Sequence, residues 1–230
     1  MRWENFLRRW LCSSLLCLAL PLSAQTTLAV LNFDNNSIAE RARLQPLCNG
    51  LSQMFTSALS QVQQLRLVER TQLTRLIDEM KLTQAGVIDG PTAQQVGKLL
   101  GAQQVLLGSF VYLPNKKLRL DARLVQVETG LTLRAGEETG KEGELFEMVA
   151  RLNKKLLREL AVRVTAAELA RLDAARNVSF AAALLYAEGV ALEDRKDFQA
   201  ARKKYEAALA VDKSFALARQ RLLELEKISQ

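Results

Sequence analysis

The stretch from Leu67 to Ser109 constrains the fold of this chain more than any other part of the sequence. It contains, in order, a short apolar run, an amphipathic segment, a polar turn, a second amphipathic segment and a second apolar run. Apolar residues at helical spacing predict helices, and short apolar runs bounded by turn residues predict strands. No residue in the stretch has the pattern of a chemically reactive group. The stretch therefore favours a small α/β interaction unit over an enzyme.

Strands are predicted wherever an apolar or alternating run is bounded by turn residues. The predicted strands are Thr27–Phe33, Leu65–Glu69, Gln104–Tyr112, Leu118–Val127 and Leu131–Ala135. Alternation of period two between Leu118 and Leu124 indicates a sheet with one solvent-exposed face. Gly130 suits the tight turn that follows, and the residues from Gly136 to Gly143 are expected to form a loop.

Helices are predicted where apolar residues recur every three to four positions. The predicted helices are Ile38–Gln63, a helix capped by Thr71 and ended by Gly86, Ala93–Leu100 and Gly143–Arg171. A break near Pro46 is expected in the first of them, and Val96, Leu99 and Leu100 are expected to be buried. The last helix also carries a basic face. This face is either simply exposed to solvent or in contact with an anionic surface. The basic residues are Arg151, Lys154, Lys155 and Arg158.

Strands and helices interleave at first, and then several strands follow one another through tight turns. This order predicts an α/β (α+β) fold, a mixed β-sheet with packed helices. An all-α, helical segment follows this part of the chain.

Residues 1–24 have the organisation of a secretory signal peptide. Three arginines precede an apolar run, residues 10–20, that is too short to span a bilayer. We predict cleavage between Ala24 and Gln25, which indicates that the mature chain is exported. A membrane anchor and a buried helix are the alternatives. Lipidation at Cys17 is not expected, because Leu16 stands directly before it, where a lipidated cysteine normally has a small residue.

The chain contains no histidine. Imidazole is the commonest general base and metal ligand, so its absence argues against most catalytic and metal-binding classes. Gly97 and Lys98 lack the spacing of a phosphate-binding loop. We therefore expect no catalytic, cofactor-binding or metal-binding residue, and an enzyme built on carboxylates is the alternative. After cleavage only Cys48 remains, so no intrachain disulfide is expected and its thiol is predicted to be buried.

The net charge of +7 and the low aromatic content, 6%, bear on the partners of the chain. Few aromatic side chains leave little surface for base stacking, so nucleic acid is not expected as a partner. For an exported chain, a positive charge suits an anionic membrane surface or the cell wall. A solvated surface without a charged partner is the alternative.

Residues 182–215 resemble one tetratricopeptide repeat (TPR), and residues 216–228 resemble its capping helix. The residues that fit the repeat are Leu185, Gly189, Leu192, Ala201, Tyr205 and Ala208. The resemblance implies binding of a protein partner. A single repeat is usually too small to be stable alone, so it is expected to pack on the preceding long helix or on another copy. A helical hairpin that serves only as a structural tail is the alternative.

The ordered residues of the central stretch resemble the CsgG-like family. The matching pieces are Val68-Glu69-Arg70, Gly86-Val87, Val96-Gly97-Lys98-Leu99-Leu100-Gly101-Ala102 and Gly108-Ser109. The resemblance covers about Thr27 to Leu160 and implies an α/β domain related to the N-terminal domain of TolB. Members of that family are exported to the periplasm or outer membrane. They include the curli secretion channel, an activator of cell-wall synthases and a flagellar-base protein, none of which is an enzyme. The resemblance therefore implies a periplasmic location for the mature chain.

Structural roles are expected for the motif residues of this resemblance, which are Glu69, Arg70, Gly97, Gly101 and Gly108. We expect three segments: a signal peptide at 1–24, a CsgG-like domain at 25–172 and a TPR-like helical module at 173–230. The expected function is that of an exported, non-enzymatic assembly or adaptor protein of the cell envelope. It would bind protein partners through the TPR, with homo-oligomer formation and cell-wall or outer-membrane association as further expectations.

The alternative function is that of a curli-type outer-membrane secretion channel component in an oligomeric ring. A membrane-spanning strand needs about 9–11 residues. The predicted strand Leu131–Ala135 is shorter than that, so we do not expect this chain to form a pore by itself.

Overall fold

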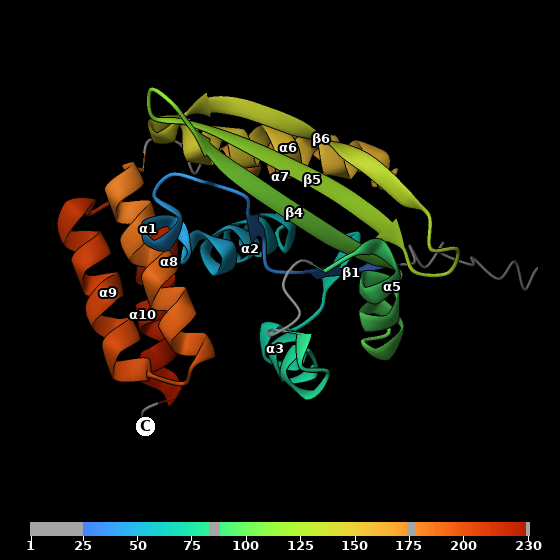
Figure 1. The fold of residues 1–230 in the computed structure, drawn as a ribbon, viewed down its shortest axis with the longest axis horizontal. Coiled ribbons are helices and arrows are strands. Elements are labelled where there is room, and N and C mark those ends of the chain that lie inside the picture. The colour runs from blue at the N-terminus through green and yellow to red at the C-terminus, as the bar shows by residue number, and fades with distance from the viewer. Residues whose placement is uncertain (1–24, 83–87, 174–177, 229–230) are drawn as a thin grey trace, which may run out of the picture.

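The structure, a computed structural model, describes residues 25–82, 88–173 and 178–228. Its centre is a six-stranded mixed sheet with the order β3-β1-β4-β5-β6, in which short β2 pairs with β4 (Figure 1). The strands are β1 (Thr26–Val30), β2 (Asp34–Asn35), β3 (Leu65–Leu67), β4 (Gln104–Leu113), β5 (Lys117–Gln126) and β6 (Thr132–Lys141). β1 runs parallel to β3 and β4, whereas β4, β5 and β6 are antiparallel. The predicted fold class, a mixed sheet with packed helices followed by helices, is confirmed.

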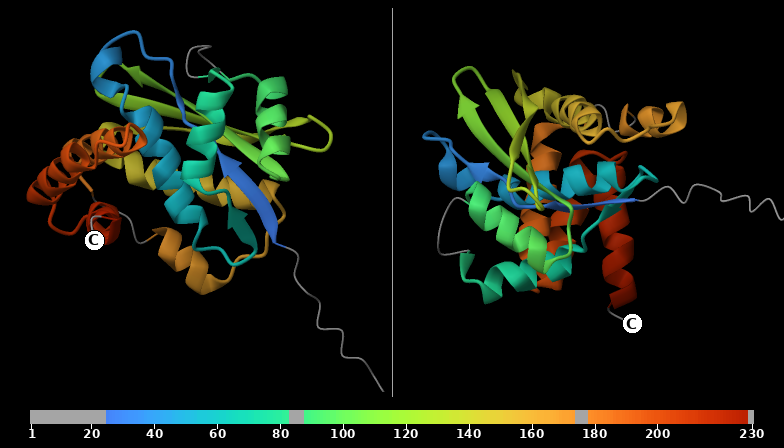
Figure 2. Two further views of the ribbon diagram at one scale, coloured as in Figure 1. Left: turned by 90° about the horizontal axis from the view of Figure 1, so that it is seen from below. Right: turned by 90° about the vertical axis from the view of Figure 1, so that its right-hand side faces the viewer.

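Helices cover both faces of the sheet and then form a separate group at the end of the chain. They are α1 (Arg41–Leu44), α2 (Leu47–Leu59), α3 (Arg70–Glu79), α5 (Gly90–Leu99), α6 (Leu145–Glu159), α7 (Ala166–Asp173), α8 (Phe180–Asp194), α9 (Phe198–Val211) and α10 (Ala216–Ile228). A 3-10 turn, Glu142–Glu144, precedes α6. Helices α8 to α10 gather at one end of the molecule (Figures 1 and 2).

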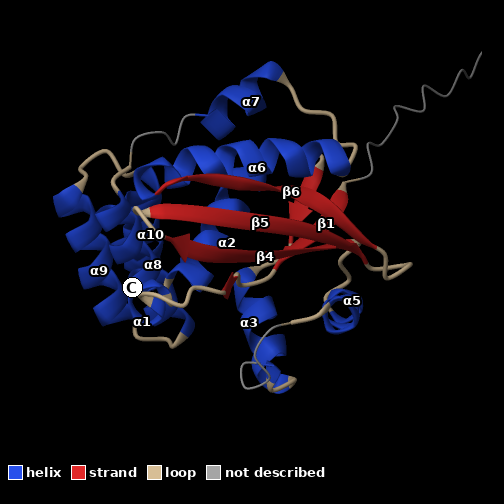
Figure 3. Ribbon diagram, turned by 45° about the horizontal axis from the view of Figure 1, so that its top comes forward, coloured by secondary structure: helices blue, strands red, loops and turns tan. Residues whose placement is uncertain are grey.

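Alternation along β1 divides the core into two layers, because successive strand side chains point to opposite faces. Leu28 and Val30 belong to the larger cluster, with side chains of α2, α6 and α8. Ala29 and Leu31 belong to the smaller cluster, with side chains of α3 and α5. Figure 3 shows α6 along one side of the sheet, with α3 and α5 on the other. The thiol of Cys48 is buried in the larger cluster, as expected, and burial raises its pKa to about 12.

The last strand is longer than the sequence predicts. β6 extends from Thr132 to Lys141 and pairs with all but the last residue of β5, with a bulge at Ala122/Arg123. The polar segment expected as a loop is therefore part of the sheet, because its backbone pairs with β5 whatever its side chains are. β5 and β6 are each ten residues long, so the predicted strand Leu131–Ala135 was too short, and strand length does not count against a spanning hairpin. One face of this hairpin packs against α6.

The long helix predicted from Gly143 to Arg171 is two helices. α6 ends at Glu159, and Ala161 takes the left-handed conformation (φ 50°) that breaks the helix. Glu168 then accepts hydrogen bonds from the backbone N–H and the hydroxyl of Thr165, at 2.7 and 2.8 Å, as in a capping box. The helix predicted from Ile38 to Gln63 is likewise divided, with Pro46 at the N-cap of α2.

The two helices of the central stretch differ from the prediction in detail. α3 begins at Arg70 with Glu69 at its N-cap position, so Thr71 is not the cap. The predicted end of this helix at Gly86 lies outside the described residues. α5 is capped by Asp89, which accepts a hydrogen bond from Thr92 N at 2.9 Å, and it buries Val96. Leu99 is 61% exposed, contrary to the prediction, because it lies on the outer side of the last turn of α5.

The C-terminal helices join the larger core cluster. Within the C-terminal helices α8 packs against α9, and its main contact with the rest of the chain is α2 rather than the long helix that the sequence suggested. At this crossing a side-chain carbon added to Gly50 would lie 2.4 Å from Cβ of Ala187. From α6, Phe146 makes an edge contact with Phe215, with ring centroids 5.5 Å apart. The sheet and these helices therefore share one continuous apolar core.

Candidate protein-binding groove

A groove of about 640 Å³ lies between α3 and the C-terminal helices. We call it the α3 groove. Its residues are Glu69, Arg70, Thr71, Gln72, Thr74, Arg75, Asp78, Glu79, Glu193, Asp194, Lys196, Phe198 and Arg221. A neighbouring cavity of about 390 Å³ shares Arg70, Thr74, Asp78 and Asp194 with it and adds apolar side chains such as Ile77 and Ile88. The space is large enough for a polypeptide segment, and both the sheet part and the helical part of the chain line it.

An ion pair between Arg70 and Asp194 joins the two walls of the α3 groove. Arg70 Nε donates to Asp194 Oδ1 at 2.8 Å, and Nη2 donates to Oδ2 at 2.5 Å. The two side chains are only 18% and 15% exposed. Two parallel N–H donors from one guanidinium form the strongest geometry for holding a carboxylate. The pair therefore fixes α3 relative to the end of α8.

Residues of α2 and of the segment after β1 complete this network. Arg70 Nη1 donates to Ser52 Oγ at 3.0 Å, and Asn49 Nδ2 donates to Asp194 Oδ2. The hydroxyl of Ser52 lies 3.0 Å from Asn32 Oδ1 and 2.8 Å from the carbonyl oxygen of Asn49. Asn32 lies two residues after the end of β1, and Asn49 and Ser52 lie on α2. Polar groups of α2 thus contact both the carboxylate of Asp194 and the guanidinium of Arg70, and Asn32 supports them through Ser52.

The structure brings only two of the predicted motif residues to this groove, Glu69 and Arg70. Gly97 lies against Val105 and Val127, and a side-chain carbon there would approach both within 2.7 Å. Gly108 lies against the ring of Phe33 in the same way. These two glycines therefore let helix and strand, or strand and ring, approach closely. Gly101 takes φ 65° directly after α5, a conformation that glycine tolerates best.

The residues of the predicted repeat lie between α8 and α9. Ala201, Tyr205 and Ala208 are buried, and Gly189 packs against the ring of Tyr205. Leu185 and Leu192 are half-buried at the edge of the same layer. Of the predicted cleavage pair, Ala24 lies outside the described residues and Gln25 is exposed at their start.

Sequence reasoning missed the partners of Arg70. Asn32, Asn49, Ser52 and Asp194 are ordinary polar residues without a motif, and Asp194 is 124 positions away from Arg70. One available signal was the pair of acids that ends α8, because negative charge at a helix C-terminus is unfavourable. Such a position indicates that a basic partner lies elsewhere in the structure.

The basic face of α6 is partly occupied by β6. Arg151 Nε lies 2.6 Å from Glu138 Oε2, and Lys155 Nζ lies 2.7 Å from Glu138 Oε1. Burial raises the pKa of Glu138, but the hydrogen bonds from Lys155 and Arg151 outweigh it and hold the pKa below its ordinary value. Lys155 also donates to the carbonyl oxygen of Glu137 at 2.8 Å. Two of the four basic side chains thus secure the edge strand.

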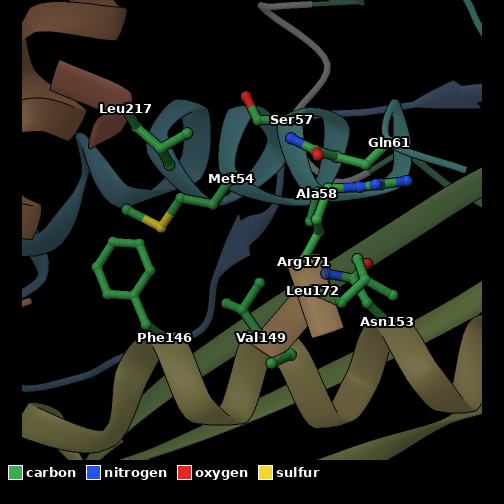
Figure 4. Close-up of a pocket in the computed structure, with 11 residues that line it drawn as sticks. Met54, Ser57, Ala58, Gln61, Phe146, Val149, Asn153, Arg171, Leu172 and Leu217 are labelled. Atoms are coloured by element: carbon green, nitrogen blue, oxygen red, sulfur yellow. The ribbon is translucent and has the colours of Figure 1, made fainter. Parts of the chain in front are cut away.

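A smaller cavity of about 70 Å³ lies within the core between α2, α6 and α7 (Figure 4). Met54, Phe146 and Leu172 give it an apolar lining. Asn153 is fully buried beside it, and its amide has no hydrogen-bond partner among the described residues. Its volume is far below that of the α3 groove, so the groove is the stronger candidate for a macromolecular partner.

A metal site and a membrane-spanning helix are two further features that the described residues could contain. Residues 25–82, 88–173 and 178–228 contain no group of three or more His, Cys, Asp or Glu side chains that could hold a metal ion. Within the same ranges, none of the helices has both the length and the apolar character needed to cross a membrane.

Residues 16–117 match a family model. That model is described as the curli production assembly/transport component CsgG. The match includes Asn32, Asn49, Ser52 and Arg70 and ends at the first residue of β5, so Asp194 lies outside it. A search of curated proteins found no match.

Solved structures resemble parts of the chain. The LpoB C-terminal domain from Salmonella enterica is 21% identical, with a TM-score of 0.41 over 51% of this chain and 84% of that one. The LpoB C-terminal domain from Escherichia coli is 21% identical, with a TM-score of 0.40 over 53% and 86%. Lipoprotein GNA1162 from Neisseria meningitidis is 17% identical, with a TM-score of 0.38 over 61% and 99%.

Proposed function

We propose that this chain is an exported, non-enzymatic assembly or adaptor protein of the cell envelope. The observation that carries the proposal is the α3 groove, whose walls come from the CsgG-like part of the chain and from the C-terminal helices. A groove built from both parts suits a role in which a partner bridges them. The proposed segments are the signal peptide at 1–24, the CsgG-like domain at 25–172 and the TPR-like module at 173–230.

The exposed chemistry of the groove supports a polypeptide as the occupant. Phe198 is 39% exposed on its wall and offers an aromatic contact, while Arg75 and Lys196 offer charged ones. Aromatic and arginine side chains contribute most of the binding free energy in many protein interfaces. The partner would therefore lie along α3 and contact the start of α9.

Site-specific photo-cross-linking tests this proposal. A photoreactive residue at Arg75, inside the groove, is expected to capture a defined protein in the cells that produce the chain. The same residue at Lys98, exposed on α5 outside the groove, serves as the matched control. Capture of the same protein at both positions with equal yield, or at neither, would contradict the proposed role of the groove.

Export is tested separately by cell fractionation and by mass measurement of the mature protein. A periplasmic chain that begins at Gln25 agrees with the proposal. A lipid-modified Cys17 would contradict the predicted cleavage site, and a mature chain that retains residues 1–24 would contradict the signal peptide.

A second candidate function is favoured by the description of the matching family model. In it the chain is a curli-type secretion component that forms an oligomeric ring in the outer membrane. Mass measurement of the detergent-extracted protein separates the two functions. A membrane-embedded ring of many copies supports the secretion component, whereas a soluble monomer or small oligomer supports the adaptor.

A further inference from the structure

The Arg70 network lies where the chain reverses its winding about β1. The connection from β1 to β3 passes through α2 on one face of the sheet, and the connection from β3 to β4 passes through α3 and α5 on the other. In open α/β sheets, ligands bind outside the carboxyl ends of the strands at such a reversal. The reversal lies between β1 and β4, which are neighbours in the sheet. Asn32 follows the carboxyl end of β1 at this reversal, and Arg70 follows that of β3, the strand on the other side of β1. The cavity of about 390 Å³ is lined by Asn32 and Arg70, so it lies next to the position that the topology marks for a ligand.

The donors at this position form a receptor for a carboxylate. Arg70 presents its Nε and Nη2 in parallel, and Asn49 adds its amide N–H to the same group. Ser52 holds the guanidinium from the other side through Nη1. The position is not empty, because the carboxylate of Asp194 occupies it.

Asp194 is poorly placed for the helix that carries it. It is the last residue of α8, Glu193 precedes it, and the last turn contains no basic residue. Negative charge at a helix C-terminus is destabilising, because the helix dipole is negative at that end. Ion pairing with Arg70 compensates for this cost. Asp194 is thus positioned as a ligand of Arg70, supplied from the C-terminal helices to a site built by the sheet.

The surroundings leave room for exchange of this ligand. Both cavities next to the pair, of about 640 and 390 Å³, are lined by Arg70 and Asp194. The wall that carries Arg70 is lightly held, since Leu73 is the one residue of α3 that is buried. A segment lying in the α3 groove can therefore reach Arg70 without rearrangement of the sheet.

We propose that the carboxyl ends of β1 and β3 form a carboxylate-binding site that Asp194 fills in cis, and that an acidic side chain of the protein partner replaces Asp194 when the adaptor is loaded. The site itself follows from the geometry alone. Its occupation by a partner rests on the proposed function. In the free chain, Asp194 keeps Arg70 paired, and the groove beside the pair is open.

Chemical rescue of the full chain tests the site. In Asp194→Ala, sodium acetate is expected to raise the melting temperature more than sodium chloride of equal ionic strength, because acetate re-forms the pair with Arg70. Acetate also stabilises proteins in general more than chloride does, so the acetate-minus-chloride difference in wild type and in Arg70→Ala gives the baseline. A difference in Asp194→Ala that is no larger than this baseline overturns the site. If that variant does not fold, Asp194→Ser carries the same test.

Photo-cross-linking at Arg75 tests the exchange. In Asp194→Asn the ion pair is lost while the shape is kept, so the yield of the captured partner is expected to increase several-fold. Arg70→Gln is expected to abolish capture. An unchanged or reduced yield in Asp194→Asn overturns the acidic partner, even if acetate rescue succeeds. If no variant captures a partner at Arg75, the proposed function fails, while the acetate result still decides whether the site exists.

Discussion

Tyr186 and Tyr205 bury their hydroxyl groups among the C-terminal helices. Both residues are 0% exposed, their ring centroids lie 5.6 Å apart, and neither hydroxyl has a hydrogen-bond partner among the described residues. Burial raises the pKa of both hydroxyls, because the phenolate would be desolvated. The rings thus contribute apolar packing, whereas the hydroxyl groups carry a desolvation cost.

Replacement of Tyr205 by Phe tests this balance. Tyr205→Phe is expected to leave the free energy of unfolding unchanged or to raise it by about 1 kcal/mol, since an unpaired buried polar group is removed. Tyr205→Ala, the matched control, is expected to lower it by about 3–5 kcal/mol through loss of the ring. Urea denaturation of the three proteins measures both values. A clear loss of stability in the Phe variant would show that the hydroxyl is hydrogen-bonded.

Glu168 gives a pH-dependent contribution to stability. It accepts hydrogen bonds from the backbone N–H groups of Gln63 (2.9 Å) and Thr165, and these lower its pKa from 4.5 to about 2. A carboxyl with a lowered folded-state pKa stabilises the fold above its unfolded pKa and loses that contribution as pH falls toward the folded value. The stability difference between wild type and Glu168→Gln is therefore expected to be constant above about pH 5 and to shrink between pH 4.5 and 2. Denaturation at a series of pH values measures this, and a difference independent of pH would exclude the role of the charge.

At the scale of elements, close helix contact joins the sheet to the C-terminal helices. α2 crosses α8 where Gly50 meets Ala187, and Gly189 of α8 receives the ring of Tyr205 from α9. Small residues at such crossings let helices approach until their backbones nearly touch. A second contact between elements joins α6 to β6, where Arg151 and Lys155 form ion pairs with Glu138.

The α2–α8 crossing is tested by Gly50→Ala. Alanine favours a helix over glycine by about 1 kcal/mol, yet the added carbon would lie 2.4 Å from Cβ and 2.9 Å from Cα of Ala187. Because part of the obstacle is backbone, the helices must move apart, and a net loss of about 1–3 kcal/mol in unfolding free energy is expected. Gly143→Ala, where nothing lies within 4 Å, is the control and should be close to neutral. Thermal denaturation of both variants measures the change in unfolding free energy. A Gly50→Ala variant more stable than wild type would contradict the described crossing.

At the scale of the whole molecule, the Arg70–Asp194 pair and the shared apolar core connect the C-terminal helices to the sheet. The pair is largely buried, so its removal affects how the two parts sit together and not just local charge. The α3 groove and its neighbouring cavity both depend on this arrangement.

A double-mutant cycle on Arg70 and Asp194 measures this connection. Arg70→Ala and Asp194→Ala are each expected to destabilise the chain, and the double variant is expected to lose less than their sum. A coupling free energy of about 1–3 kcal/mol is expected for a charged, bidentate hydrogen-bonded pair. Arg202 and Glu206, an exposed pair within α9, are the control and should couple by about 0.5 kcal/mol or less. Additive effects at Arg70 and Asp194 would show that the pair does not join the two parts.

The sequence by itself determined most of the local structure of this protein. Apolar periodicity predicted the mixed sheet and most helices, and Gly101 was correctly placed at a helix end, because these features depend on residues within a few positions. Periodicity missed the polar second half of β6 and the break at Ala161, since strand pairing and helix packing outweigh local preference there.

Tertiary structure alone decided the groove and its network. Arg70 is part of a recognisable motif, but Asp194 lies 124 positions further along and ends a helix whose apolar pattern says nothing about it. The position of a single carboxylate such as that of Asp194 cannot be predicted from apolar periodicity. Its partner depends on where α8 packs on α2. That docking depends on the shapes of Gly50 and Ala187 in three dimensions, which no pattern within either helix encodes.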